Sequence, residues 1–300
     1  MEDYITLSLK RLSTKMSTLL PHTGELALSD EVRIVRAKAT CKELSWSAPS
    51  WCMVLSGSKE WSLGQHTLTM SAGSLTFTTL HLPAVSTDAA KQDYVAVYLS
   101  EYSAYGAKVL EHIQARMGQC EPLDESLGIV MPWGQSVVNA SQLNALERLI
   151  DWYAQDRADE LLYELYIQEL YYWVLLDKAL RAPWEHFIIR GSNALFNTVN
   201  FMASHYQDKE ALSISVLAAR AGLSVPAFYM AFKELTSMTP LQYLKYLRLL
   251  KARKLLQTGE YKAYQAAAAV GYVSAPHFCR DYRKLFLYSP KHDCARLKNT

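Results

Sequence analysis

Apolar positions recur with two different spacings along the first two thirds of the chain. Between about residues 31 and 100, short apolar runs are separated by Gly57, Gly64 and Gly73. Short strands joined at glycines indicate a small antiparallel β-barrel. The predicted strands are 32–37, 51–56, 60–63, 66–70, 75–80 and 94–99. From about 101 to 180 apolar residues recur at three and four positions, which predicts helices at 105–117, 142–153 and 160–180.

The last third of the chain contains one helical pattern twice. The first copy consists of Leu217–Ser224, Phe228 and Phe232. The second consists of Ala266–Ser274, Phe278 and Tyr282, with one residue inserted in the turn. Small residues on the first helix, a glycine in the turn, a serine N-cap and aromatics four residues apart predict a helix-turn-helix in each copy.

Each copy ends in a hydroxyl residue and a proline, Thr239-Pro240 and Ser289-Pro290, a typical N-cap and first-turn pair. The first pair predicts a helix over 240–256. At 1.5 Å per residue this helix is about 25 Å long. That length suits a spacer that sets two recognition helices about one duplex turn, ~34 Å, apart.

Charge divides the chain in the same way. The net charge is +2, but the residues from Arg181 onward carry 17 Lys plus Arg against 7 Asp plus Glu, and the first 180 carry 14 against 22. A basic helical segment joined to an acidic one is typical of a phosphate-binding module carried by a unit that does not touch DNA.

Residues 192–297 resemble the DNA-binding domain of AraC/XylS transcription regulators. The matching residues are Leu217-Ala218, Gly222-Leu223-Ser224, Phe228, Phe232-Lys233, Thr239–Tyr243, Leu247-Arg248-Leu249, Ala252-Arg253, Leu255-Leu256, Val270-Gly271-Tyr272, Ser274, Phe278, Arg280, Tyr282 and Ser289-Pro290. The N-terminal part is similar to the cupin-like sensor domain of one branch of this family. Its matching residues are Pro49, Cys52–Lys59, Leu63-Gly64, Ala72-Gly73 and Leu82-Pro83.

The two resemblances imply an α+β fold with two domains. Residues 1–182 are expected to form a cupin-like sensor and dimerisation domain, with a barrel at about 31–100 and helices at about 101–180. Residues 183–193 would be a linker. Residues 194–300 would form an all-α DNA-binding domain, with two helix-turn-helix motifs joined by a linker helix. The 300 residues, half of them hydrophobic, suffice for two cores.

The family places base-reading residues early in the second helix of each motif. The candidates for base contact are Pro226, Tyr229, Met230, Ala275, Pro276, His277, Cys279 and Arg280. Arg280 alone has the side chain that reads guanine with two hydrogen bonds. Met230 stands where the family very often carries Arg, and the prolines offer apolar contact only. The candidates for phosphate contact are Ser224, Lys233, Lys245, Arg248, Ser274, Arg283 and Lys284.

The barrel is a candidate site for a small apolar or aromatic effector, although its aromatic residues could equally fill its core. The candidate pocket residues are Trp46, Trp51, Trp61, Phe77, His81, Tyr94 and Tyr98. A catalytic cupin needs closely spaced histidines and a glutamate around a metal. His66 and His81 are fifteen residues apart. We therefore expect that the protein binds no metal and no cofactor and that it is not an enzyme.

The resemblance also implies partners. They are double-stranded DNA, RNA polymerase and a second copy of the chain. The apolar stripe that suggests a dimer contact comprises Leu143, Leu146, Leu149, Ile150 and Tyr153. The chain has no apolar run of eighteen residues, and its N-terminus is acidic, so we expect a cytoplasmic protein that has no contact with a membrane. Five cysteines without CxxC spacing are expected to be reduced thiols.

The sequence therefore predicts a sequence-specific, DNA-binding transcription regulator. The resemblance favours an activator, but the residues themselves do not decide between activation and repression. The alternative is an interaction protein with a partly degenerate DNA-binding domain and no small-molecule effector, which the weak base-reading positions suggest.

Overall fold

The fold is known here from a computed structural model. It describes residues 2–37, 43–47, 50–63, 66–78, 82–88, 93–100, 103–118, 133–155, 159–181, 194–208, 210–236, 238–286 and 288–298. We refer to residues 2–181 as the N-terminal unit and to residues 194–298 as the C-terminal unit. The predicted linker at 183–193 lies outside the described residues, so the exact domain limits stay a prediction.

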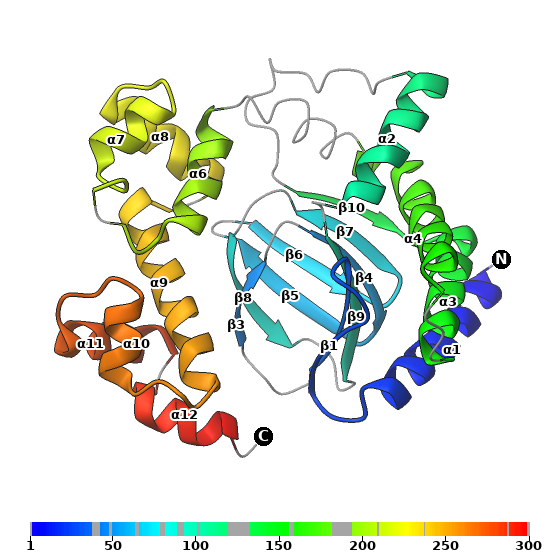
Figure 1. The fold of residues 1–300 in the computed structure, drawn as a ribbon, viewed down its shortest axis with the longest axis horizontal. Helices are drawn as coiled ribbons and strands as arrows, with labels where there is room; N and C mark the ends of the chain where they lie inside the picture. Colours follow the sequence, from blue (N-terminus) through cyan, green and yellow to red (C-terminus); the bar gives the residue numbers. More distant parts are fainter. Residues whose placement is uncertain are drawn as a thin grey trace.

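The N-terminal unit contains two antiparallel sheets (Figure 1). The six-stranded sheet has the order β1 (Gly24–Ala27), β2 (Val32–Ala37), β9 (Tyr94–Ser100), β4 (Ser50–Ser56), β7 (Ser74–Thr78), β10 (Trp133–Val137). The four-stranded sheet has the order β3 (Glu43–Ser47), β8 (Leu82–Asp88), β5 (Ser58–Leu63), β6 (His66–Ser71). All six predicted strands are present. The pattern missed β1, β3, β8 and β10. Because β10 pairs with β7, the sheet extends beyond the predicted barrel limit at residue 100.

Strand alternation divides the apolar residues between two cores. On β4, Trp51 and Met53 belong to the cluster that packs against helices, whereas Cys52 and Val54 belong to the cluster inside the sandwich. Successive side chains of a strand point to opposite faces, so a strand buried on both faces reads as an unbroken apolar run. The inner cluster also takes Trp61 from β5, so the two sheets pack face to face.

A layer of helices covers the outer face of the six-stranded sheet. It comprises α1 (Glu2–Leu19), α2 (Ala104–Met117), α3 (Ala140–Ala154) and α4 (Glu160–Leu175). The helices predicted at 105–117 and 142–153 are confirmed, and the one predicted at 160–180 corresponds to α4 and a short turn of helix at 178–181. Asn139 and Gln142 form a capping box at the start of α3.

The helix α1 was not predicted. Its buried apolar side chains are few, namely Leu9, Leu12 and Met16, and its exposed side mixes polar residues with Tyr4 and Leu7. Lys15 holds α1 to α3 through ion pairs with Glu147, at 2.8 Å, and Asp151, at 2.7 Å. Isolated helical propensity did not mark this segment, because its position depends on packing against the sheet and α3.

The C-terminal unit consists of seven helices among the described residues. They are α6 (Ala194–Ser204), α7 (Ile214–Arg220), α8 (Val225–Thr236), α9 (Pro240–Gln257), α10 (Ala263–Ala269), α11 (Ala275–Phe286) and α12 (Pro290–Lys298). The two helix-turn-helix motifs, α7–α8 and α10–α11, confirm the reading of the repeat. The second turn is one residue longer, as predicted. Thr239 caps α9, and Pro240 stands in its first turn.

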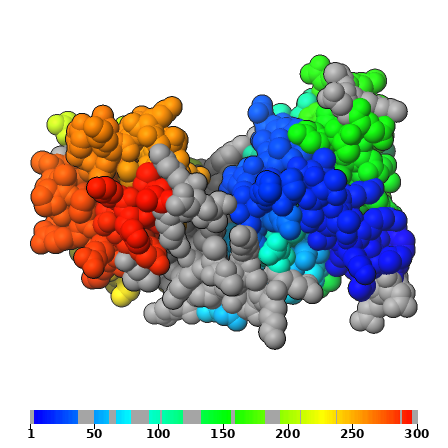
Figure 2. Space-filling model, turned by 90° about the horizontal axis from the view of Figure 1, so that it is seen from below, coloured from blue at the N-terminus to red at the C-terminus, as the bar shows by residue number. Residues whose placement is uncertain are grey.

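The helix α9 joins the two motifs and contributes to both of their cores. Tyr243, Leu244 and Leu247 lie in the cluster of the first motif, whereas Leu250 and Leu256 lie in that of the second. The same helix lies against β3 and β8 of the N-terminal unit. Figure 2 shows the second motif and α12 at one end of the molecule and the helical layer at the other.

A buried ion pair fixes α12 to α9. Asp293 is fully buried and accepts hydrogen bonds from Arg253 Nε at 2.8 Å and from the hydroxyl of Tyr282 at 2.9 Å. Because Tyr282 belongs to α11, the carboxylate connects α12 to both α9 and α11. A buried charge is tolerated only where it is paired in this way.

Candidate nucleic-acid interface

The turn of each motif depends on a glycine with positive φ. Gly222 has φ +66° and Gly271 has φ +84°. A serine follows each turn and caps the next helix: Ser224 Oγ accepts from the backbone N–H of Ala227, and Ser274 Oγ accepts from that of His277, both at 3.4 Å. The two turns therefore position α8 and α11 in the same way, through a glycine with positive φ and a serine N-cap.

The candidate base-contact residues lie early on α8 and α11, as the motif predicts. Pro226, Met230, Pro276, His277 and Arg280 are exposed, and Met230 has 68 % of its surface free. The remaining three, Tyr229, Ala275 and Cys279, are half-buried. The inner sides of both helices are fixed by buried aromatics, Phe228 and Phe232 on α8 and Phe278 and Tyr282 on α11.

The candidate phosphate-contact residues fall into two groups. Five have exposed side chains: Ser224, Lys233, Ser274, Arg283 and Lys284. Lys245 and Arg248, both on α9, make contacts within the chain instead. Lys245 forms an ion pair with Asp281 at 2.7 Å, and Arg248 Nε donates to the backbone carbonyl of Tyr206 at 2.7 Å. Burial lowers the pKa of Arg248.

Asp281 is a residue that the sequence analysis missed. It lies on α11, where it pairs with Lys245 of α9 and accepts from the hydroxyl of Tyr272 at 3.3 Å. The carboxylate thus holds the second recognition helix to the connecting helix and to its own turn. An acidic residue on an otherwise basic helix, one position after Arg280, was the signal available in the sequence.

The aromatic residues of the N-terminal unit divide between the two faces of the sheet. Trp51 and Phe77 stack at 4.1 Å on the outer face, against the helical layer. Their alternation along β4 and β7 turns them away from the inside of the sandwich, so they do not wall a pocket there. Trp61, Tyr94 and Tyr98 belong to the inner cluster. Of the other two candidates, Trp46 is described by its backbone only, and His81 lies outside the described residues.

Polar groups lie beside these inner aromatics. The ammonium of Lys59, a residue only 6 % exposed, is 4.6 Å from the centre of the Tyr94 ring. The Tyr94 hydroxyl is 3.5 Å from the Cys52 thiol. Burial raises the pKa of Cys52 to about 11, so it stays a neutral thiol at physiological pH. Lys59 was missed because the predicted strand began at residue 60, whereas β5 begins at Ser58, so the side chain of Lys59 was not assigned to a face.

The structure gives two further findings on ligands and membranes. Among the described residues, no group of His, Cys, Asp or Glu side chains could hold a metal ion. No single described helix is long and apolar enough to cross a membrane. Among the described helices, only α7 and α8 taken together have the length and the composition of a membrane span, and they are bent by 78° relative to one another.

Comparison with known proteins identifies the family. Residues 29–181 match the N-terminus of AraC-type transcriptional regulators, and residues 217–295 match a helix-turn-helix domain. The chain belongs to the AraC family of transcription regulators. The first match covers β2 to β10 and the helices α2, α3 and α4, and leaves out α1 and β1. The second covers both motifs from Leu217 onward and most of α12.

Curated relatives of this AraC family member include the transcriptional activator RhaS. RhaS of Escherichia fergusonii is 28 % identical over 120 residues, which cover 39 % of this chain and 43 % of RhaS. RhaS of Escherichia coli K12 is 25 % identical over 154 residues, which cover 51 % and 55 %. The chain thus spans about half the length of the curated relatives it matches.

Solved structures of ToxT from Vibrio cholerae share the fold across both units. An apo variant superposes with a TM-score of 0.60 at 9 % identity, covering 90 % of this chain and 98 % of ToxT. ToxT bound to (E)-4-(8-methylnaphthalen-1-yl)but-3-enoic acid gives 0.59 at 10 % identity, covering 89 % and 98 %. The cupin-like unit followed by a two-motif helical unit is therefore an arrangement that this AraC family member shares with ToxT.

The two turn glycines form a matched pair for a stability test. A Cβ on Gly222 would meet nothing within 4 Å, whereas one on Gly271 would lie 3.2 Å from the Gln207 carbonyl and 3.3 Å from the Arg248 guanidinium. We expect Gly222→Ala to lower the free energy of unfolding by about 1–2 kcal/mol, since its only effect is to hold an alanine at a positive φ. Gly271→Ala should cost about 1 kcal/mol more, since it also displaces neighbours. Denaturant unfolding of both variants measures the difference, and equal costs would contradict it.

Proposed function

We propose that this AraC family member is a transcription regulator that acts in the cytoplasm and places α8 and α11 in successive major grooves of DNA. The observation that carries the proposal is the construction of α9. One helix, about 27 Å long, enters the cores of both motifs. We propose that α9 thereby fixes the separation of the two recognition helices, since its length is of the order of one duplex turn, ~34 Å.

The charges on this surface support binding to the DNA backbone more strongly than reading of its sequence. Lys233, Arg283 and Lys284 are exposed near the ends of α8 and α11, where they could contact phosphates. Arg280 is the exposed side chain best suited to read a guanine. Met230 and the two prolines offer only apolar contact, for example with a thymine methyl group. The proposed specificity thus rests on Arg280 and on DNA shape.

Replacing Arg280 tests direct readout. If Arg280 reads one G·C pair, Arg280→Ala should lose about 1–3 kcal/mol of preference at that pair while non-specific binding is retained. The measurement is a competition assay on an operator selected from a random library, repeated with each base pair varied.

Lys284→Ala is the matched control on the same helix. It should weaken binding to all sequences alike and reduce the salt dependence of binding by about one unit of slope. Equal losses on every sequence for Arg280→Ala would refute direct readout. Absence of any salt-dependent DNA binding by the unaltered chain would favour the alternative, an interaction protein with a degenerate DNA-binding unit.

We further propose that the inner face of the sandwich binds a carboxylate effector with an apolar body. Structures of ToxT include complexes with an unsaturated fatty acid and with a naphthalenyl butenoic acid, and both ligands are carboxylates. In this chain Lys59 supplies a buried ammonium beside Tyr94 and Tyr98. Among the described side chains no carboxylate pairs with it, and a buried cation gains from a counter-charge.

Lys59→Gln tests this effector. Oleate binding to the full chain, followed by calorimetry, should weaken about tenfold or more, since the variant loses a charge-assisted hydrogen bond. Asp88→Asn is the companion variant, because Asp88 stands opposite Lys59 in the pairing of β5 with β8. It should bind oleate at least as well as the unaltered chain. Unchanged oleate affinity in Lys59→Gln would exclude Lys59 as the carboxylate partner.

A homodimer and a contact with RNA polymerase complete the proposal. Most of the predicted dimer stripe on α3 is buried within one chain by α1 and α4, so it offers no free surface for a dimer. The buried residues are Leu143, Leu146, Leu149 and Ile150, and Tyr153 is half-buried. The outer side of α4 exposes Leu161, Leu165 and Tyr172. We propose this side of α4 as the dimer contact.

Introducing charges on the exposed side of α4 tests the dimer. We expect the unaltered chain to be dimeric at tens of micromolar by size exclusion with light scattering, and Leu161→Glu with Leu165→Glu to be monomeric, because the two carboxylates would be buried unpaired at the contact. Val273→Glu, at an exposed apolar residue of the second motif, is the control and should stay dimeric. A monomeric unaltered chain would rule the contact out.

A further inference from the structure

The two motifs are also connected away from α9, at the segment that follows α6, residues 205–208. Tyr206 packs against the apolar clusters of both motifs. The backbone carbonyl of Gln207 lies 3.2 Å from the position that a Cβ on Gly271 would take. Segment 205–208 therefore lies directly against the turn that leads into α11.

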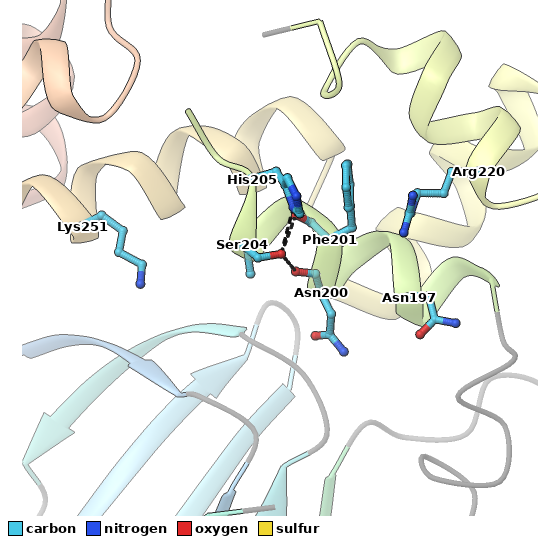
Figure 3. A pocket seen from close by; sticks show the side chains of 8 residues that line it. Asn197, Asn200, Phe201, Ser204, His205, Arg220 and Lys251 are labelled. Carbon is cyan, nitrogen blue, oxygen red and sulfur yellow. Dashed lines mark hydrogen bonds between the residues drawn. The ribbon is translucent and has the colours of Figure 1, made fainter. Parts of the chain in front are cut away.

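Aromatic stacking fixes the end of α6 to the first motif. Figure 3 shows the Phe201 ring between His205 and the side chain of Arg220. The Arg220 guanidinium lies 4.0 Å from the centre of that ring, and the His205 ring stacks on it, also at 4.0 Å. Because Arg220 belongs to α7, these contacts hold segment 205–208 beside the first motif. The Tyr206 carbonyl, next along the chain, is thus an acceptor of fixed position.

Arg248 of α9 lies between this segment and the second turn. Its Nε donates to the Tyr206 carbonyl at 2.7 Å. Its Cζ and Nη2 atoms lie 3.3 Å from the position of a Cβ on Gly271. Gly271, which has no Cβ, leaves room for this approach. One planar guanidinium therefore contacts the end of α6 and the turn of the second motif together.

The apolar core of the second motif does not by itself fix its orientation. That core packs on α9 through residues such as Leu250 and Leu256. A unit attached to one helix can rock about it unless a contact away from the core prevents this motion. Arg248 at the second turn and the ion pair of Lys245 with Asp281 are contacts of this kind. Lys245 has 43 % of its side chain exposed, so water weakens its pair, whereas Arg248 is half-buried.

We propose that Arg248 is a positioning residue that fixes the orientation of α11 relative to α8. It holds the second turn against segment 205–208, which Arg220 and Phe201 hold to the first motif. Arg248 thereby sets the spacing of the two DNA subsites that the chain accepts, and only this consequence rests on the proposed function. One base-pair step moves a subsite by ~3.4 Å and turns it by about 35°, so a rigid pair of recognition helices tolerates few spacings.

Distances between the recognition helices in the free protein test the orientation. Spin labels on genetically encoded non-natural residues at Glu234 and Lys284, equivalent exposed positions of α8 and α11, report the separation by double electron–electron resonance. The unaltered chain should give one narrow distribution. Arg248→Met keeps the aliphatic stem and removes the donor, so the distribution should broaden or shift. Arg248→Lys, which retains a charged donor, should lie between the two.

Lys254→Met, at an exposed lysine of the same helix, is the matched control and should leave the distribution unchanged. Circular dichroism melts verify that each variant is folded. Gly271→Ala, whose Cβ would displace the Arg248 guanidinium, should broaden the distribution as Arg248→Met does, and it decides the matter if Arg248→Met does not fold. An unchanged distribution in the deciding variant, or equal broadening in Lys254→Met, overturns the proposal.

DNA binding tests the consequence for spacing. One base pair inserted between the subsites of a selected operator should weaken binding of the unaltered chain about tenfold, because one recognition helix loses its base contacts. In Arg248→Met this loss should fall to about threefold or less, since the second motif can follow its subsite. A variant that is merely less stable would lose affinity at both spacings alike.

An equal loss on insertion in Arg248→Met and in the unaltered chain would overturn the link between Arg248 and subsite spacing. Absence of DNA binding by the unaltered chain would instead refute the proposed function. The distances between α8 and α11 would still decide on Arg248 in that case, since they are measured without DNA.

Discussion

The burial of α9 on several sides is the constraint on which the rest of the molecule depends. Its first half packs into the first motif through Tyr243 and Leu247, and its second half packs into the second motif through Leu250 and Leu256. The ion pairs of Lys245 and Arg253 then fix α11 and α12 to the same helix. A helix held in this way cannot bend freely, so the separation of α8 and α11 is set by its length.

Strand alternation plays the corresponding part in the N-terminal unit. Because β4 and β9 are buried on both faces, alternate residues of each strand pack against the helical layer, and the residues between them pack into the inner face of the sandwich. The outer face is filled with aliphatic residues and the Trp51–Phe77 stack. The inner face carries the Cys52, Lys59 and Tyr94 group instead. The inner face of the sheet therefore combines aromatic residues with a buried cation and a thiol.

Local patterns in the sequence predicted most of the fold. They failed for the elements whose structure depends on tertiary contacts. The repeat predicted both motifs, with their capping serines and Thr239-Pro240, because these signals lie within a few residues. The strand β10 and the helix α1 were missed, since each is defined by distant partners, β7 and α3. The stripe of Leu146 and Ile150 was recognised as apolar, but apolar spacing does not tell a core from a dimer contact. For the same reason the faces of Trp51 and Phe77 could not be assigned.

The position of α9 also connects the two units. The first motif and the inner face of the sandwich belong to one continuous apolar cluster, whereas the second motif has a cluster of its own. A change inside the sandwich can therefore reach α8 through packed side chains, while among the described residues the second motif is connected to this cluster through α9 and through Tyr206, which packs against both clusters. Coupling between two sites requires an element whose arrangement both sites bias. In this chain α9 is in the position that such an element requires, because it contacts the strands β3 and β8 and also packs into the cores of both motifs. An effector would accordingly act on the orientation of the pair of recognition helices and leave their separation unchanged.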